Sequence, residues 1–305
     1  MGKQRTSHRL RLPFLLRVKE SVGGIFKRLL RHRVATLGGI VVILAFLCAI
    51  FAPFLSPYDP LEQNLANRLK PLGWTDIDGH VHILGTDQLG RDVMSRIVFG
   101  SQVSLIVGTA SVLLGGILGL ILGLISGYFG KWVDDLIMRV VDITLSFPFI
   151  ILALCIIAIL GTSLFNLIIV LAVTGWVIYA RVVRASVLSV KEMDFVQAAR
   201  AIGTSDFKII LKHILPNVVA PFIVISSFQV ARMIIIEASL GFLGLGVPPP
   251  IPTWGNMLSD GREYLQEAWW IGTFPGIAIV LLVLGINLLG DGLRDALDPK
   301  TYLKE

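Results

Sequence analysis

Cysteine and charged residues are both scarce in this sequence. The 305 residues include two cysteines, Cys48 and Cys155, and each lies inside an apolar run. Disulfide frameworks and thiolate metal sites are therefore not expected, and we interpret both cysteines as small core residues. Charged residues make up 16% of the chain and hydrophobic residues 54%, with a mean hydropathy of +0.77. This balance excludes a soluble domain and indicates a polytopic membrane protein.

Patterns of catalysis and nucleotide binding are also missing. The sequence has no Ser/His/Asp grouping, no metal-ligand spacing and no paired carboxylates in any motif. Gly130 and Lys131 are followed by Trp132, whereas a phosphate-binding P-loop requires Ser or Thr after Gly-Lys. We therefore predict no enzyme activity, no metal and no cofactor in this chain. The histidines are scattered, and the pair at 80 and 82 is interpreted as polar surface: His8, His32, His80, His82 and His213.

Six apolar runs are long enough to cross a bilayer core of about 30 Å at about 1.5 Å per helical residue. No charge occurs between Ile143 and Ala180, and a break at 161–166 divides this stretch into an antiparallel pair. The first run is longer than a signal-peptide core and ends in prolines, so we interpret it as an uncleaved anchor. The six predicted spans are 34–55, 101–129, 137–160, 164–186, 216–240 and 268–290. An all-α integral membrane protein with six transmembrane helices is expected.

The basic residues indicate how these spans are oriented. Of the 27 Lys and Arg, 21 lie on the side that holds both ends of the chain and the loop at 188–215, five lie on the other side, and Arg232 lies within a span. Cytoplasmic loops are enriched in Lys and Arg, so the basic tail at 1–33, this loop and the terminus at 291–305 are predicted to be cytoplasmic. The predicted external segments are 56–100 and 241–267. The net charge of +6 is thus a topology signal, and no nucleic-acid partner is expected.

The polar loop at 188–217 is amphipathic. Its pattern predicts one helix, a break at Gly203, and a second helix in which Thr204 or Ser205 caps the free N–H groups of the first turn. Pro216 marks the return to an apolar run. Apolar residues recur at helical spacing in the second helix: Phe207, Ile210, Leu211 and Ile214. Such a stripe is suited to lie against another surface, either a partner protein or the membrane.

The residue spacing in this loop resembles a signature of bacterial ABC importer permeases. In that signature Glu-Ala-Ala is followed after three residues by Gly, and after nine more by Ile-x-Leu-Pro. The residues on this frame are Gln197, Ala198, Ala199, Gly203, Leu215 and Pro216. Gln197 replaces the usual Glu, and His213 replaces the usual Ile. The resemblance implies a coupling helix that docks into an ATPase subunit, with Phe207, Ile210 and Leu211 also in the contact.

Three further motifs are similar to those of one branch of these permeases. HILGTDQLGRDVMSR at 82–96, PPPIPTWGNML at 248–258 and GDGLRDALDP at 290–299 look like the permease subunits of dipeptide, oligopeptide and nickel importers. The closer likeness is to the second of the two paired permeases. The resemblance implies the type I importer permease fold, with a permease core at about 97–298.

The same resemblance implies partners and a location. They are a second, homologous permease, two subunits that bind ATP and Mg, and an extracytoplasmic solute-binding protein, assembled in the bacterial cytoplasmic membrane. The expected substrates are dipeptides and oligopeptides. Two alternatives stay open: an importer of nickel or another small solute with the same architecture, and a secondary transporter driven by an ion gradient, which typically has inverted repeats.

Charged and rigid residues outside the loop are further candidates for function. Arg232 and Glu237 lie in or near the fifth span, where a charge is costly unless it is paired or hydrated. Each is either satisfied by another helix or lines the aqueous path and meets a peptide terminus; five positions apart, they do not share a helix face. The predicted external segments contain five further candidates. Each either belongs to a gate or docking surface or has a local structural role. They are Asp87, Arg91, Asp92, Pro249 and Trp254.

Glycines recur at every fourth position in the second span: Gly115, Gly119, Gly123 and Gly127. This spacing aligns them on one helix face and allows another helix to approach closely. The neighbouring helix belongs either to this subunit or to a partner subunit.

Overall fold

The computed structural model describes Leu29 and residues 32–297. Predictions for the basic tail at 1–33 and for 298–305 therefore lie largely outside the described residues. The long helices are α2 (Arg33–Ile50), α4 (Val93–Phe129), α7 (Leu164–Lys191), α10 (Leu215–Phe242) and α12 (Trp270–Leu297). The shorter helices are α3 (Ala52–Leu55), α5 (Lys131–Leu145), α6 (Phe149–Leu160), α8 (Asp194–Ala201), α9 (Asp206–Ile209) and α11 (Trp254–Glu263), with a 3₁₀ turn at Leu65–Asn67 and a π-helical segment at Ile210–Ile214. Strands β1 (Trp74–Thr75) and β2 (Val81–His82) form a small antiparallel hairpin.

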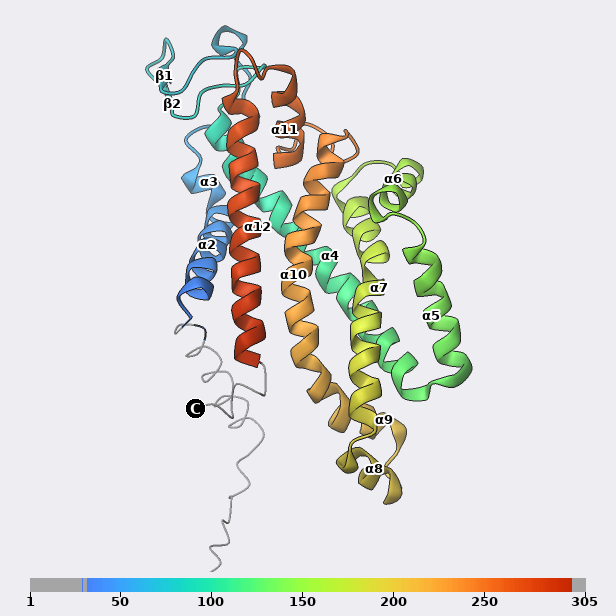
Figure 1. Ribbon diagram of the computed structural model, residues 1–305. Coiled ribbons are helices and arrows are strands. Elements are labelled where there is room, and N and C mark those ends of the chain that lie inside the picture. The colour runs from blue at the N-terminus through green and yellow to red at the C-terminus, as the bar shows by residue number, and fades with distance from the viewer. Residues whose placement is uncertain (1–28, 30–31, 298–305) are drawn as a thin grey trace, which may run out of the picture.

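The long helices form one bundle (Figure 1). α12 packs against α2 and α10, and α4 crosses the bundle diagonally to pack along α7. α8 and α9 lie at one end, which is also where α2 begins and α12 ends. The hairpin and α11 lie at the opposite end (Figure 1). The predicted cytoplasmic loop and the predicted external segments are therefore separated by the full length of the bundle.

The described residues contain five apolar helices that can cross a membrane, and a sixth crossing if one bent pair is a single span. Five helices are long and apolar enough to span a membrane, and α5 with α6 passes the same test as a pair bent by 89°. This bend corrects the prediction of one helix at 137–160. Pro148 has no N–H to donate and disfavours a helical conformation at Phe147, so the helix breaks there. α4 is also longer than predicted, because it begins at Val93 and not at 101.

The glycine stripe of α4 packs within the subunit. A Cβ atom at Gly115 would lie 2.8 Å from the carbonyl oxygen of Ala172 on α7. At Gly123, a Cβ would lie 2.7 Å from the Cβ of Val183. Because only hydrogen at these positions lets the two backbones approach so closely, the stripe serves the contact between α4 and α7.

The second helix of the polar loop continues into α10 without a break. Residues Asp206–Phe242 form one helix of 37 residues, and Pro216, where the apolar run begins, lies inside it. Proline has no N–H to donate to the preceding turn, and the change from the π-helical segment to α10 lies at this position. Ser205 occupies the N-cap position of α9, but its side chain accepts no capping hydrogen bond, so the predicted cap is wrong.

The prediction that both cysteines are core residues holds only in part. Cys48 is half-buried on α2, and Cys155 is exposed on α6. α6 buries Ala153 and Ile157. Cys155 lies two positions from each of them, so the helical period turns it to the opposite face.

Candidate functional site

The polar loop makes a tight turn at Gly203 between α8 and α9. Gly203 has φ +78°, a conformation that residues with a Cβ rarely adopt. Its N–H donates to the carbonyl oxygen of Arg200 at 3.0 Å, and the N–H of Thr204 donates to that of Ala199 at 3.1 Å. These bonds close the C-terminal end of α8 in the manner typical of a glycine-terminated helix. The predicted break is therefore a defined turn that needs glycine.

Gln197 ties α8 to the end of α7. Its side-chain amide donates a hydrogen bond of 2.8 Å to the carbonyl oxygen of Lys191. A glutamate, the residue usual at this position of the loop signature, has no N–H and cannot make this bond when ionised. Of the two alanines that follow, Ala199 is buried and Ala198 is exposed. The departure from the signature thus has a local structural role.

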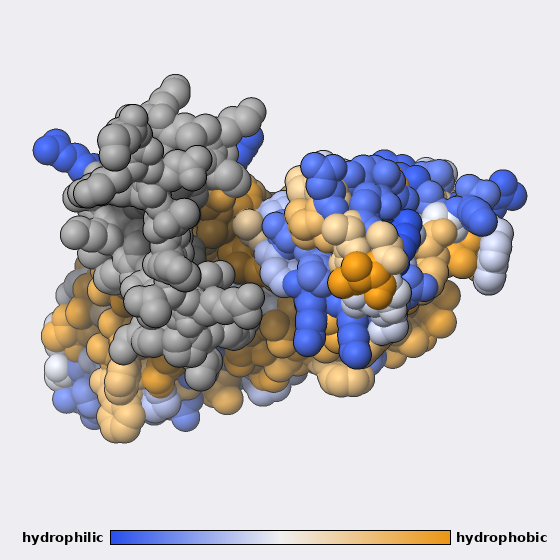
Figure 2. Space-filling model, turned by 90° about the horizontal axis from the view of Figure 1, so that it is seen from below, coloured by the Kyte–Doolittle hydropathy of each residue, from blue (hydrophilic) through white to orange (hydrophobic). Residues whose placement is uncertain are grey.

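The predicted apolar stripe divides into a buried side and an exposed side. Ile214 is buried in a cluster with α4 and α7, and Ile210 packs against the same cluster. Phe207 is 71% exposed and Leu211 43%, and Ile202 beside the turn is 82% exposed. At the next positions Leu215 is half-buried and Pro216 exposed. Figure 2 shows hydrophobic side chains surrounded by hydrophilic ones at this end of the molecule. We call Ile202, Phe207 and Leu211 the apolar patch.

The loop is fixed to the end of α4 by contacts that the sequence did not reveal. The hydroxyl of Tyr128 donates to Asp206 at 2.5 Å, and the guanidinium of Arg200 lies 5.5 Å from the Tyr128 ring centroid. The ammonium of Lys191 donates to the carbonyl oxygen of Gly127 at 3.0 Å. Hydrogen bonding to Tyr128 raises the pKa of Arg200 above its ordinary value. The one available signal was a tyrosine at the end of a charge-free run, where its polar tip needs a partner.

Arg232 lines a cavity of about 450 Å³ between α6, α10 and α12. Its guanidinium lies 4.9 Å from the ring centroid of Phe149, at the start of α6, and Asn287 of α12 also lines the cavity. No carboxylate pairs with Arg232 among the described residues. The bend at Pro148 forms part of the wall. Arg232 is therefore an unpaired cation beside an open, mostly apolar space.

Glu237 does not face this cavity. It is fully buried, and its Oε2 accepts a hydrogen bond of 2.9 Å from the hydroxyl of Ser104 on α4. Of the two charged candidates in α10, Glu237 thus contacts another helix, whereas Arg232 lines open space. No direct bridge joins them in the described structure, as expected for residues five positions apart.

At the opposite end, Asp87 organises a buried ion network. Its Oδ2 lies 2.7 Å from Nε of Arg91 and also pairs with Arg96. Both arginines reach Asp260 on α11, at 3.7 and 3.5 Å. Asp87 and Arg91 are buried, so they act as local ties between the 56–100 segment and α11. A partner protein that bound at this end would contact the 56–100 segment, whose shape Asp87 and Arg91 maintain.

The remaining external candidates differ in exposure. Asp92 is buried, caps α4 through the N–H of Ser95 at 2.7 Å, and pairs with Nδ1 of His82 at 2.9 Å. The prediction of His82 as polar surface is therefore wrong. Trp254 is buried, and its indole N–H donates to the carbonyl oxygen of Ile97 at 2.9 Å. Pro249 is exposed.

Comparison with known families identifies this architecture. The family described as "Binding-protein-dependent transport system inner membrane component" matches residues 119–302, more than half of the chain. The chain belongs to this family. The N-terminal transmembrane domain of oligopeptide transport permease C matches residues 23–71. The chain is therefore a multi-pass membrane permease of the peptide-permease branch that its motifs resemble.

Individual relatives of this permease cover nearly its whole length. It is 47% identical over 275 residues to the dipeptide transport system permease protein DppC of Alkalihalophilus pseudofirmus, covering 90% of this chain and 88% of that protein. It is 44% identical over 270 residues to the di/tripeptide transport system permease protein DppC of Pseudomonas aeruginosa, covering 88% and 89%. These similarities extend through the polar loop at 188–217 and the segments at 56–100 and 241–267.

A solved structure shows the same fold. A chain of the MetNI methionine ABC transporter, in an inward-facing conformation, superimposes on this permease with a TM-score of 0.55 and 22% identity. The match covers 68% of this chain and 98% of that chain. The type I importer permease fold expected from the motifs is thereby confirmed.

Proposed function

We propose that this permease forms half of the translocation path of an ATP-driven importer of dipeptides and oligopeptides in a bacterial cytoplasmic membrane. The observation that carries the proposal is the exposed apolar patch on a loop fixed to three long helices. Water-exposed apolar side chains on a rigid frame favour docking of a partner protein. The names of the curated relatives support peptides as the cargo.

The proposed assembly contains this chain, a second homologous permease, two ATP-binding subunits and an extracytoplasmic solute-binding protein. The ATPase subunits dock on the apolar patch and carry ATP and Mg, because this chain has no P-loop pattern. The solute-binding protein docks at the opposite end, near the hairpin, α11 and Pro249. The loop passes the movement of the ATPases to α4, α7 and α10 as a rigid body, since it is bonded to all three.

In this assembly Arg232 meets the C-terminal carboxylate of the peptide. A half-buried guanidinium with an aromatic ring on one side and open space on the other can bind a carboxylate through two parallel hydrogen bonds. The cavity walls are mainly apolar, which suits a peptide whose side chains vary. Glu237 is assigned no contact with the peptide.

Arg232→Gln will lower uptake of peptides with a free C-terminal carboxylate by about tenfold or more, because a hydrogen-bonded charge pair contributes about 1.5–3 kcal/mol. Uptake of the same peptides with an amidated C-terminus will fall much less. Initial rates with both labelled series measure the difference. Arg262→Gln is the comparison variant, since Arg262 on α11 also lies over an aromatic ring, 5.5 Å from the Phe242 centroid; it should change uptake of the free and the amidated peptides by the same factor. Equal losses for free and amidated peptides would show that Arg232 acts only on structure.

Uptake in cells tests the function as a whole. Cells with and without this chain receive labelled peptides of two to six residues, with labelled nickel in parallel. We expect peptide uptake to require the chain and to continue when the ion gradient is collapsed while ATP is maintained. Loss of nickel uptake with unchanged peptide uptake would overturn the substrate assignment, and dependence on the ion gradient would overturn the mechanism.

A further inference from the structure

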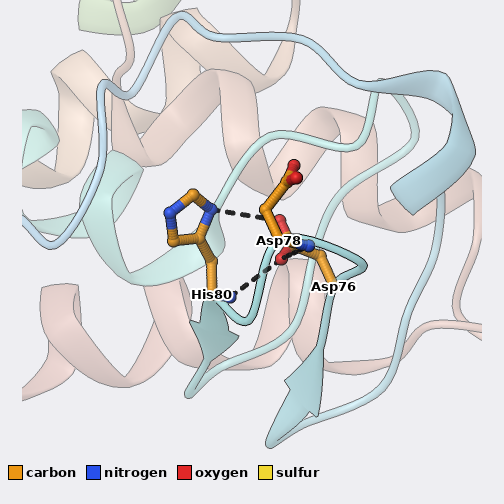
Figure 3. A group of neighbouring side chains, drawn as sticks. All are labelled: Asp76, Asp78 and His80. Carbon is orange, nitrogen blue, oxygen red and sulfur yellow. Dashed lines mark hydrogen bonds and ion pairs between the residues drawn. The ribbon is translucent and has the colours of Figure 1, made fainter.

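The turn of the β1–β2 hairpin gathers two carboxylates and an imidazole. Asp76, Asp78 and His80 each offer one ligand atom, and these atoms lie within 4.8 Å of one another (Figure 3). Asp76 Oδ1 accepts the backbone N–H groups of Asp78 at 2.9 Å and His80 at 2.8 Å. Its Oδ2 lies 3.2 Å from Nδ1 of His80 (Figure 3). The side chain of Asp76 is therefore held in place.

These residues line a small acidic cavity. Its volume is about 80 Å³, which is room for a cation with water ligands. No Lys or Arg is found among the described residues that line it. The negative charge of the carboxylates is thus not balanced within the cavity. The acidic lining residues are Asp59, Glu62, Asp76, Asp78 and Asp92.

His82 provides an independent sign of a missing ligand. It lines the same cavity and is only 6% exposed. Nδ1 is bound to Asp92, whereas Nε2 is buried and has no hydrogen-bond partner among the described residues. Leaving such a nitrogen unpaired costs about 1–3 kcal/mol. An imidazole that is held through one nitrogen by a carboxylate and presents the other is the usual arrangement of a metal-binding histidine.

The aromatic ring of Tyr58 brings the two histidines to the same place. Its centroid lies 5.3 Å from the His80 ring and 5.0 Å from the His82 ring. The ring of Trp74 also stacks on the ring of His82, with 6.0 Å between the centroids and an interplanar angle of 15°. The histidines that appeared scattered in the sequence are thus neighbours on one cavity.

We propose that Asp76, Asp78 and His80 bind a divalent transition-metal cation such as Zn²⁺, with Nε2 of His82 on the cavity wall accepting a hydrogen bond from a water ligand of the cation. Mixed imidazole and carboxylate donors suit Zn²⁺ and its neighbours, whereas Ca²⁺ and Mg²⁺ take oxygen ligands. This site is at the opposite end from the apolar patch, and its occupancy does not depend on what the permease transports.

Metal binding to the purified complex tests the site. The transporter in detergent is dialysed against Zn²⁺ alone, and bound metal is measured by mass spectrometry. Asp78→Asn is the test variant, because in the described structure the Asp78 side chain makes no hydrogen bond that folding could need. We expect the variant to bind Zn²⁺ roughly ten- to hundredfold more weakly at this one site. Glu267→Gln, which removes an exposed carboxylate of the other external segment, is the control and keeps wild-type affinity.

A second variant tests the contribution of His82. His82→Phe keeps a ring between Tyr58 and Trp74 but removes both nitrogens, and it should weaken Zn²⁺ binding while the complex remains assembled. Equal Zn²⁺ binding by wild type and Asp78→Asn would overturn the proposal, as would competition by Ca²⁺ at concentrations equal to Zn²⁺. Because the readout is bound metal, its failure leaves peptide uptake untouched, and failure of peptide uptake leaves this site untouched.

Discussion

Replacing Gly203 with valine will reduce ATP-driven peptide uptake by on the order of tenfold or more while the transporter still assembles. Gly203 has φ +78°, and a residue with a Cβ pays about 1–2 kcal/mol to adopt it, more for a β-branched side chain. No atom lies within 4 Å of the position that a Cβ would occupy, so the effect is one of backbone conformation and not of collision. The turn will open, and the apolar patch will lose its fixed position. Uptake per assembled complex is the measurement.

Gly161→Val is the matched control for that experiment. Gly161 also has a positive φ, +81°, and open space around it, but it lies between α6 and α7, away from the coupling loop. Both variants put valine at a glycine with positive φ and therefore carry the same kind of backbone strain. A difference in uptake between them is then due to the position of the glycine and not to the substitution itself. Unchanged uptake by Gly203→Val, or an equal loss in both variants, would remove the loop from the mechanism.

Replacing Phe207 with glutamate will detach the ATPase subunits. Phe207 is 71% exposed in this chain, so the substitution should not disturb folding. Burial of a phenylalanine in an interface contributes about 1.5–3 kcal/mol, and its loss weakens binding roughly ten- to hundredfold before the cost of burying a charge. Copurification of the ATPase subunits with the membrane subunits, together with ATP hydrolysis by the complex, measures the effect.

Ile77→Glu provides the comparison for Phe207→Glu. Ile77 is 97% exposed on the β1–β2 hairpin, so this variant adds the same charge at an apolar surface position at the opposite end of the bundle. It should leave the association with the ATPase subunits unchanged. If Phe207→Glu also retained them at wild-type affinity, the apolar patch would not be the docking surface.

The features of the fold that could be predicted from the sequence are those that depend on residues close together in the chain. Helical periodicity and a glycine break are properties of a few neighbouring residues, so the two loop helices and Gly203 followed directly from them. The six apolar runs were found for the same reason. Periodicity also placed Phe207 and Ile214 on one stripe, but only the fold shows that the first is exposed and the second buried.

The parts that sequence could not predict depend on distant residues or on competing local signals. Tyr128 and Asp206 meet across 78 positions, and neither has a neighbourhood that marks the other. The burial of His82 depends on Tyr58 and on Asp92. Pro148 was visible in the sequence, but the charge-free stretch from Ile143 had to be extended back to Ile137 to cross a membrane, and this favoured one straight helix over a break. The apolar character of such a run predicts membrane insertion, but it does not show whether the helix axis is straight or bent.

One helix joins the two ends of the protein. Asp206–Phe242 contains 37 residues, which is about 55 Å at 1.5 Å per residue. Its far end packs against α11, where a Cβ at Gly255 would lie 2.5 Å from the carbonyl oxygen of Ala238, and α11 carries Asp260 into the arginine network. A ligand at the α11 end that favours one tilt of this rod would therefore change the affinity for a partner at the loop end by a given factor. That factor acts equally in both directions, because a coupling free energy belongs to the pair of sites and not to either one.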